Sequence, residues 1–182
     1  MIEIRYHGRG GQGSVVASKI LADAAFKEGN DVQSFPYFGV ERRGAPVTAF
    51  TRIDRKTIRI KSEIYTPDHV VILDPSLVGV VNMTYGIKKE GTILINSSRA
   101  PGEIDLGVPN RIYTVDATKI ALDNKLGSMA APIVNTAIVG AFSRISGVVS
   151  IESVLAAIEE TVPIKKEANM LAAREAFDSV KG

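Results

Sequence analysis

The sequence predicts an α/β fold of three layers. We expect a mostly parallel, Rossmann-like sheet with an added β-hairpin and a helical C-terminal third. Strand-like runs alternate with helical stretches through the first two thirds of the chain, which is typical of this class. His69–Leu73 is a continuous apolar run, as in parallel strands buried on both faces. With 182 residues, 45% of them hydrophobic, a full core is possible. We therefore expect a single domain over residues 1–182.

The chain opens with a strand, a glycine turn and a helix. Ile2–Tyr6 is a short run of alternating apolar and polar residues, which is typical of a strand. A helix is expected from Ser14 to about Glu28, and Ser14 can cap it. Gly29 and the asparagine after it would end this helix. Its expected buried face consists of Val15, Val16, Ile20, Leu21 and Ala24.

The later elements follow from periodicity, caps and breakers. Strands are expected at Val32–Phe35, Val47–Ile53, Thr57–Lys61, His69–Leu73, Thr92–Asn96 and Arg111–Val115. The second and third of these would form a hairpin turned by Asp54–Lys56. Helices are expected at about Pro75–Val81, from the cap Asp116 to about Asn124, at Pro132–Ile145, at Ile151–Thr161 after the cap Ser150, and at about Lys165–Val180.

The glycine turn is the first candidate site. Gly8, Gly10 and Gly13 fit the pattern G-x-G-x-x-G between a strand and a helix. The first amides of a helix have no partner within it, and the helix dipole favours negative charge there. The candidate anion-binding residues are Gly8, Arg9, Gly10, Gly11, Gln12, Gly13 and Ser14. The alternative is a tight turn that needs the backbone angles of glycine.

Two usual ligands of such loops are disfavoured. A dinucleotide site also needs an acidic residue about 20 residues on, at the end of the second strand. Here that strand runs into Pro36, and Asp31 lies at its wrong end. No Gly-Lys-Ser/Thr closes the turn, so a P-loop is excluded. The loop favours close backbone approach, but not NAD or ATP in their usual poses.

A second candidate site is the loop Pro36–Pro46, which contains aromatic residues and two arginines where a polar turn is expected. Tyr37 and Phe38 are either covered by a partner or tucked onto their own domain. Arg42 and Arg43 suit a phosphate-bearing ligand or an acidic partner. Five further basic residues follow up to the end of the expected hairpin: Arg52, Arg55, Lys56, Arg59 and Lys61. Those at the turn favour a solvated hairpin edge.

Composition excludes several classes of function. The chain has no Cys and two His, so it cannot supply thiolates to an iron–sulfur cluster, and a zinc site is disfavoured. A net charge of +2 does not indicate nucleic-acid binding. No signal peptide or membrane span is visible, so we expect a cytoplasmic protein without membrane contact.

Three motifs in order resemble a known family: His7–Gly13, Phe35–Pro46 and Pro132–Thr136. They look like the gamma subunit of pyruvate:ferredoxin oxidoreductase, which is the third domain of the single-chain enzymes. Related 2-oxoisovalerate and 2-oxoglutarate enzymes carry similar chains, and Glu41–Pro46 resembles the pyruvate and branched-chain types more. The third motif adds Asn135 to the candidate cofactor-binding residues.

The resemblance implies a complex that converts a 2-oxoacid, CoA and oxidised ferredoxin to acyl-CoA, CO2 and reduced ferredoxin. It implies that thiamine diphosphate, Mg and iron–sulfur clusters lie on alpha, beta and delta-type partner subunits. This chain would hold no cofactor alone and no catalytic residue. It would close the active site and help to bind CoA at an interface, and the isolated chain would be inactive.

Two alternatives remain open at this point. One is a stand-alone nucleotide- or acyl-CoA-binding α/β protein, and the other is a purely structural interaction module. The subunit hypothesis carries one further expectation about surfaces. The aromatic segment Phe35–Phe38 and the small-residue helix beginning at Pro132 would be covered by partners.

Overall fold

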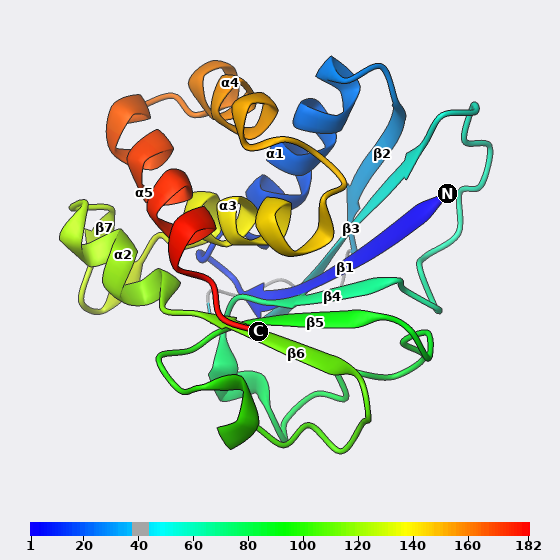
Figure 1. Cartoon of the computed structure of the whole chain (residues 1–182), viewed down its shortest axis with the longest axis horizontal. Coiled ribbons are helices and arrows are strands. Elements are labelled where there is room, and N and C mark those ends of the chain that lie inside the picture. The colour runs from blue at the N-terminus through cyan, green and yellow to red at the C-terminus, as the bar shows by residue number, and fades with distance from the viewer. Residues whose placement is uncertain (38–43) are drawn as a thin grey trace.

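The computed structural model describes residues 1–37 and 44–182. A six-stranded sheet in the order β2-β3-β1-β4-β5-β6 forms its centre (Figure 1). The strands are β1 (Ile2–Arg9), β2 (Asp31–Pro36), β3 (Pro46–Asp54), β4 (His69–Ile72), β5 (Thr92–Asn96) and β6 (Arg111–Val115). β1, β4, β5 and β6 are parallel, whereas β3 is antiparallel to both of its neighbours. The expected α/β class with a mostly parallel sheet is confirmed.

The hairpin of this sheet differs from the expected one. β2 and β3 pair with each other from Asp31 opposite Asp54 to Pro36 opposite Ala49. Thr57–Lys61, expected to pair with β3, belongs to no strand. The reason is that β1 and β2 already occupy both edges of β3. The alternating pattern of residues 57–61 therefore has no open edge of β3 to join.

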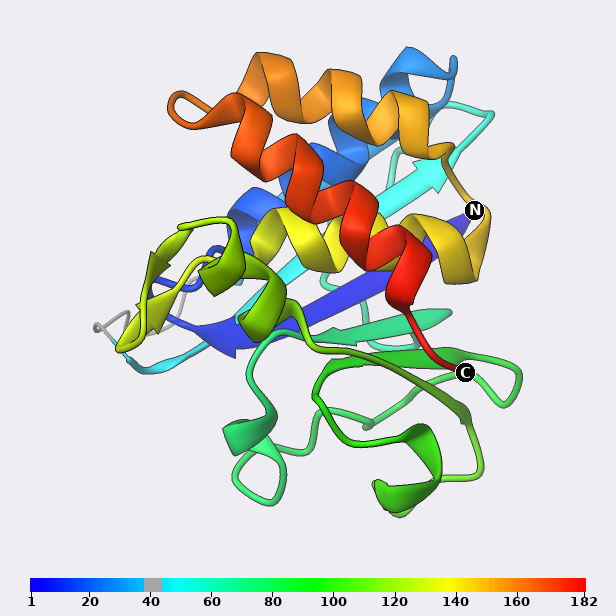
Figure 2. The same cartoon turned by 60° about the vertical axis from the view of Figure 1, so that its left-hand side comes forward.

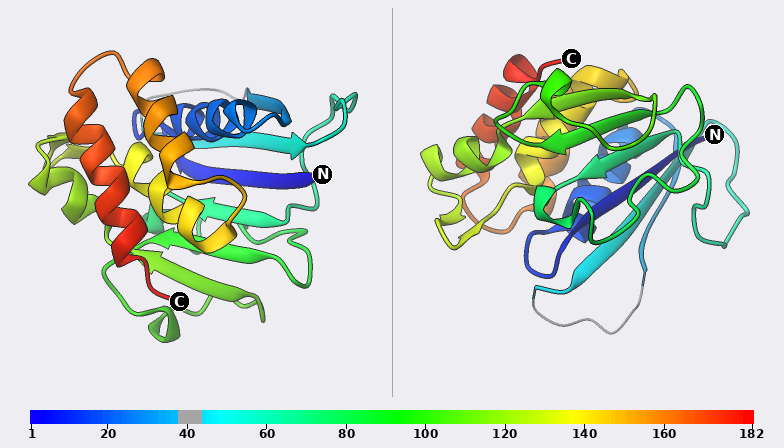
Figure 3. Two further views of the ribbon diagram at one scale, coloured as in Figure 1. Left: turned by 45° about the horizontal axis from the view of Figure 1, so that its top comes forward. Right: turned by 90° about the horizontal axis from the view of Figure 1, so that it is seen from below.

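The helices all lie on one side of the sheet (Figures 1 and 2). They are α1 (Ser14–Lys27), α2 (Ala117–Asp123), α3 (Asn135–Ser146), α4 (Ile151–Thr161) and α5 (Lys166–Ser179). On the other side, irregular segments with the short 3-10 turns η1 (Pro75–Leu77) and η2 (Pro101–Glu103) cover β4 to β6 (Figure 3). The helix expected at Pro75–Val81 is thus only one turn long, because Gly79 takes a positive φ of 81°.

Apolar residues fill both sides of the central strands. Val71 and Leu73 belong to the cluster under the helices, whereas Val70 and Ile72 belong to a smaller cluster on the opposite face. This confirms that the run after His69 is a parallel strand buried on both faces.

The start of α1 departs from expectation in two ways. Gly13, with φ 83°, occupies the N-cap position, so Ser14 is the first helical residue and its side chain caps nothing. Val15 and Val16 are 38% and 39% exposed and do not join the core. Only Ile20, Leu21 and Ala24 of the expected face are buried, since the first turn of the helix lies at the rim of the domain beside a pocket.

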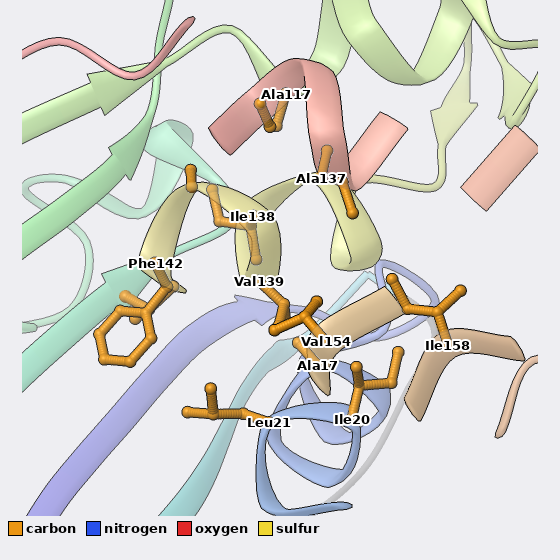
Figure 4. Packing of buried hydrophobic residues seen from close by; sticks show 14 of the residues in the cluster. Ala17, Ile20, Leu21, Ala117, Ala137, Ile138, Val139, Phe142, Val154 and Ile158 are labelled. Carbon is orange, nitrogen blue, oxygen red and sulfur yellow. The ribbon is translucent and has the colours of Figure 1, made fainter. Parts of the chain in front are cut away.

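The small residues of α3 serve this chain's own packing. A Cβ on Gly140 would lie 2.0 Å from the carbonyl oxygen of Ala173 in α5, so the two helices touch backbone to backbone. Ala137, Ile138 and Phe142 are buried against α1, α4 and the sheet (Figure 4). The expectation that a partner covers this helix is wrong. α3 begins at Asn135 and not Pro132, because the preceding residues form β8 (Ala131–Pro132), which pairs with β7 (Gly127–Ser128).

Candidate functional site

The candidate site lies where β1 ends and α1 begins. Residues 8–14, here called the glycine loop, join the two at the edge where the parallel strands have their carboxyl ends (Figure 2). Ligands of open α/β sheets bind at this edge. The β7–β8 hairpin lies at the same end of the molecule.

Some amides of the glycine loop are used internally and others are free. The amide of Gly10 donates to the carbonyl of Ala45 at 2.9 Å, and that of Gln12 donates to the carbonyl of Arg9 at 3.0 Å. For the amides of Gly11, Gly13 and Ser14, no acceptor lies within reach among residues 1–37 and 44–182. The loop therefore offers backbone donors at the positive end of α1, although fewer than its length suggests.

Two glycines allow different close approaches. Gly11 has φ 99°, and a Cβ built there meets none of the described residues within 4 Å, so residues 1–37 and 44–182 leave space beside it. Gly13 has φ 83°, and a Cβ there would lie 2.5 Å from Nδ2 of Asn135. The first residue of α3 thus packs directly on the loop. The structure therefore brings Asn135 to the glycine loop. The order of the motifs along the chain did not by itself predict this contact.

The Ser14 hydroxyl is the unusual polar group of the loop. Ser14 is only 2% exposed, and its Oγ has no hydrogen-bond partner among the described residues. It lies against Gly8, where a Cβ would come within 2.3 Å of that oxygen. A buried hydroxyl without a partner costs stability, so such a group needs an explanation.

Arg9 is tied down by a polar network that the sequence did not predict. Its guanidinium lies 3.2 Å from the Asp74 carboxylate and donates to Ser76 Oγ at 3.0 Å and to the carbonyl of Gly44. Gln12 completes the network, since its amide donates to Asp74 at 2.7 Å and its oxygen accepts from the Arg9 amide at 2.8 Å. These bonds fix the shape of the loop.

The network also sets the charge of the site. Burial raises the pKa of Asp74, but hydrogen bonds from Ser76 and Gln12 and the charge of Arg9 outweigh it and hold the pKa below its ordinary value. Asp74 is therefore ionised at neutral pH and compensates Arg9. The positive potential left for an anion comes mainly from the helix amides. Asp74 could have been found by its place after the buried strand β4.

A pocket of about 380 Å³ adjoins the loop. Val16 and Asn135, both beside the glycine loop, form part of its wall, and the α4–α5 connection with Ile164 forms another part. Lys19 and Lys165 also line it. The pocket is thus mainly apolar with cationic groups at its margin.

The other candidates are residues of the loop at Pro36–Pro46 and two polar residues at strand ends. Arg42 and Arg43 lie outside the described residues, as does Phe38. Tyr37 is about half exposed. Asn96 braces the strand ends by donating to the carbonyl of Leu73 at 3.0 Å, and Asp116 caps α2 as expected.

His7 is not available as an acid or base at this site. Its side chain meets Arg5, whose Nε donates to His7 Nε2 at 3.1 Å on the sheet face opposite the helices. Burial and the charge of Arg5 lower the pKa of His7 to about 3. The imidazole is therefore neutral at physiological pH.

No group of three or more His, Asp and Glu side chains in residues 1–37 and 44–182 could hold a metal ion. No helix in those parts of the chain is long and apolar enough to cross a bilayer.

The fold and site together define an α/β protein with an open glycine loop at the carboxyl edge of a mostly parallel sheet. The family described as pyruvate ferredoxin/flavodoxin oxidoreductase matches residues 3–179, and the chain belongs to this family. The common subunit gamma of the pyruvate/ketoisovalerate oxidoreductases of Pyrococcus abyssi is 54% identical over 185 residues, which cover 100% of this chain and 98% of that protein. The chain is thus a gamma-type subunit, as its motifs predicted.

Solved structures agree with this assignment. Pyruvate oxidoreductase subunit PORC from Thermotoga maritima superposes with a TM-score of 0.83 at 35% identity, over 99% of this chain and 97% of that one. A 2-oxoglutarate:ferredoxin oxidoreductase from Magnetococcus marinus matches with a TM-score of 0.72 at 20% identity, over 97% of this chain but 30% of that one. The second likeness shows the fold alone.

Proposed function

We propose that this gamma-type subunit closes the active site of a pyruvate or related 2-oxoacid:ferredoxin oxidoreductase and helps to bind coenzyme A with its glycine loop. Thiamine diphosphate, Mg and the iron–sulfur clusters belong to alpha, beta and delta-type partner subunits, and ferredoxin accepts the electrons. The complex acts in the cytoplasm. The main support for the proposal is the loop itself, where the amides of Gly11, Gly13 and Ser14 have no acceptor among the described residues and a Cβ on Gly11 would meet none of them within 4 Å.

The residues of the loop suit a phosphate-bearing ligand. Backbone amides at a helix N-terminus can bind phosphate oxygens even where no cationic side chain takes part. The unpartnered Ser14 hydroxyl supplies a further polar group beneath the loop. Arg9 adds a guanidinium at its edge, although Asp74 shares it. Coenzyme A supplies the thiol that receives the acyl group, and this chain's part is to hold and enclose it.

The adjoining pocket extends the same interpretation. Its apolar wall at Val16 and Ile133 continues from the loop, and Lys19 lies at its margin. A ligand with phosphates at one end and a less polar arm at the other would use both parts. The Magnetococcus marinus enzyme, whose longer chain shares this fold, was solved with coenzyme A and succinyl-CoA bound.

Exposed apolar side chains support the closing role. Met129 at the tip of the β7–β8 hairpin, Ile133 and the two valines of the first turn of α1 are exposed at this end of the molecule. Such a group beside a ligand site indicates an interface. We therefore propose that the partner subunits cover the glycine loop, and Arg42 and Arg43 remain candidate binding residues from the sequence.

Gly11 offers the sharpest test. Gly11→Leu fills the open space, whereas Gly11→Ala imposes similar backbone strain at φ 99° with little bulk. In the assembled complex we expect Gly11→Leu to raise the KM for coenzyme A about tenfold above that of Gly11→Ala, a difference of about 1.4 kcal/mol. The assembly of the complex, measured by gel filtration, should be unchanged.

Gly29 provides the matched control. It also has a positive φ and no neighbour within 4 Å, but it lies at the far end of α1. Gly29→Leu should leave the KM for coenzyme A unchanged. If Gly11→Leu instead weakens assembly, and the complex that still forms has a normal KM for coenzyme A, the loop holds a carboxylate of a neighbouring subunit and not coenzyme A.

The stand-alone hypothesis has its own test. Purified alone, the chain should show no turnover of 2-oxoacid with coenzyme A and ferredoxin. Turnover that appears only after the partner subunits are added supports the subunit function, and turnover by the isolated chain contradicts it.

A further inference from the structure

A basic segment, here called the basic strap, follows β3 on the side of the sheet away from the helices. Residues 55–62 contain four cationic residues and no carboxylate: Arg55, Lys56, Arg59 and Lys61. All four are exposed, and none forms an ion pair within residues 1–37 and 44–182. Among like-charged neighbours, each additional cation raises the local potential felt by an approaching anion.

Side chains of the sheet hold the strap in place. The amide of Ile58 donates to the Asp31 carboxylate at 2.6 Å, and the side chain of Gln33 donates to the Ile58 carbonyl. Further along, Arg52 donates to the carbonyl of Glu63 at 3.2 Å. The strap is therefore anchored to β2, and the residue that follows it is anchored to β3, although the strap belongs to no strand.

The strap leads directly into a small pocket with a buried cation at its floor. The pocket measures about 210 Å³, and Arg5 and His7 line it. Arg5 is 7% exposed and donates to His7 Nε2, to the carbonyl of Met83 at 2.9 Å and to that of Tyr85 at 2.6 Å. All of these acceptors are neutral. No carboxylate of the described residues lies within 4 Å of the guanidinium, so no ion pair within residues 1–37 and 44–182 compensates its charge.

Two tyrosines stand at the rim of this pocket. Tyr65 and Tyr85 are 60% and 68% exposed. Their turns pack back to back, because a Cβ on Gly86, at φ 71°, would lie 2.1 Å from the carbonyl oxygen of Tyr65. The rings are thus carried on fixed backbone. Tyrosine and arginine are enriched at the centres of protein–protein interfaces, so exposed tyrosines beside an arginine are typical of such a surface.

We propose that the basic strap and this pocket form a docking surface for an acidic segment of another subunit of the complex. One carboxylate of that segment enters the pocket between Tyr65 and Tyr85 to pair with Arg5, and the strap holds further carboxylates. This interface is separate from the glycine loop, since Arg5 lies on the sheet face opposite α1.

Charge complementarity selects the occupant. The surface presents the four strap cations and Arg5 against one lining carboxylate, Glu63. The nearby Asp54 is already held by the Met1 amino group at 3.0 Å. The pocket admits a side chain but is too small for most cofactors. A protein segment with spaced carboxylates satisfies the strap and the pocket together, which a single small anion cannot.

The test measures the affinity of this chain for the remaining subunits, purified without it. We expect the double variant Arg59→Glu with Lys61→Glu to weaken that affinity at least tenfold, with the effect shrinking as salt is added. We expect Tyr65→Ala with Tyr85→Ala to weaken it by a similar factor at all salt concentrations. The thermal midpoint of the isolated chain should be unchanged in both, since these side chains are exposed.

Matched controls separate this surface from general effects. Lys166→Glu with Arg174→Glu changes the same charge on α5, and Phe26→Ala removes an exposed aromatic residue from α1. Both should assemble normally. Equal losses in the controls, or normal assembly of the strap and tyrosine variants, would overturn the proposal. A third outcome would also overturn it: the strap variant binds the other subunits normally but no longer binds a short random DNA duplex. The strap would then be a general site for polyanions.

Discussion

The two faces of β1 and β3 are built from the same strands but by different chemistry. Toward the helices, β1 presents Ile4 and Tyr6, and β3 presents Ala49 and Ile53, all in one apolar cluster. Toward the other side, the alternate residues of β1 include Arg5 and His7. β3 places Arg52 there, 1% exposed and paired with Glu3 at 2.9 Å. One face is held by apolar burial and the other by directional polar bonds.

The two faces give this subunit stability and recognition by separate means. Apolar packing stabilises the fold, but it is non-directional and does not fix the positions of charged groups. Buried cations are costly unless each is paired, so a face that retains them depends on fixed partners. Arg52 has its partner within the chain, whereas Arg5 has only neutral acceptors. The following predictions test this contrast, beginning with the largest effect.

Arg52→Ala should break the polar face. It removes the ion pair with Glu3, the bond to the Glu63 carbonyl and the stacking on Phe35 at 5.3 Å, and leaves the Glu3 carboxylate, whose side chain is 14% exposed, without this partner. We expect the free energy of unfolding, measured by urea denaturation, to fall by about 3 to 5 kcal/mol. Arg55→Ala, on the exposed strap, should change it by less than about 0.5 kcal/mol. A loss near zero for Arg52→Ala would mean that this face is not held by its arginine.

Gly140→Ala should disturb the helical side. Because the added Cβ would lie 2.0 Å from the Ala173 carbonyl oxygen, α3 and α5 must move apart. We expect a loss of about 1 to 3 kcal/mol in the same measurement. Gly102→Ala, where a Cβ meets nothing within 4 Å, is the control. Comparable stabilities of the two variants would contradict close packing of the helices.

His7 should make stability depend on pH. Its pKa is about 3 in the folded chain and near 6.5 when unfolded, so the unfolded chain binds the proton first as pH falls. Its contribution is complete above pH 6.5 and is lost toward pH 3, by up to about 1.4 kcal/mol per pH unit. His7→Gln should make this decline shallower. Burial also lowers the pKa of His69, so part of the decline should remain. An unchanged slope would show that His7 protonates freely.

Ser14→Ala should have the smallest effect on stability, within about 1 kcal/mol and toward greater stability. It removes a buried hydroxyl that has no partner among the described residues. Thr114→Val, which removes the other such hydroxyl, is a control far from the loop. In the complex, Ser14→Ala should raise the KM for coenzyme A and Thr114→Val should not. A large loss of stability in Ser14→Ala would assign that hydroxyl to the fold.

The predictions from sequence were strongest where a local rule was sufficient. The run after His69, the caps Asp116 and Ser150 and the end of α1 at Gly29 each depend on residues close together in the chain, and all were found as expected. The family motifs likewise fixed the gamma-type assignment, because they are read in order along the sequence. The ligand of the glycine loop, the partners that cover it and the single-domain organisation stay predictions.

The α/β class, the positions of most strands and helices and the location of the glycine loop follow from the sequence alone. Which strands pair with the two edges of β3 was settled only in the folded chain, where β1 and β2 occupy both edges and leave none for the strand predicted at Thr57–Lys61. Packing in the folded chain also brings α3 onto α5 and Asp74 to Arg9, and it leaves Arg5 without a carboxylate of the described residues within 4 Å. These outcomes depend on residues distant in the chain but adjacent in space, and no local period or cap records such distances.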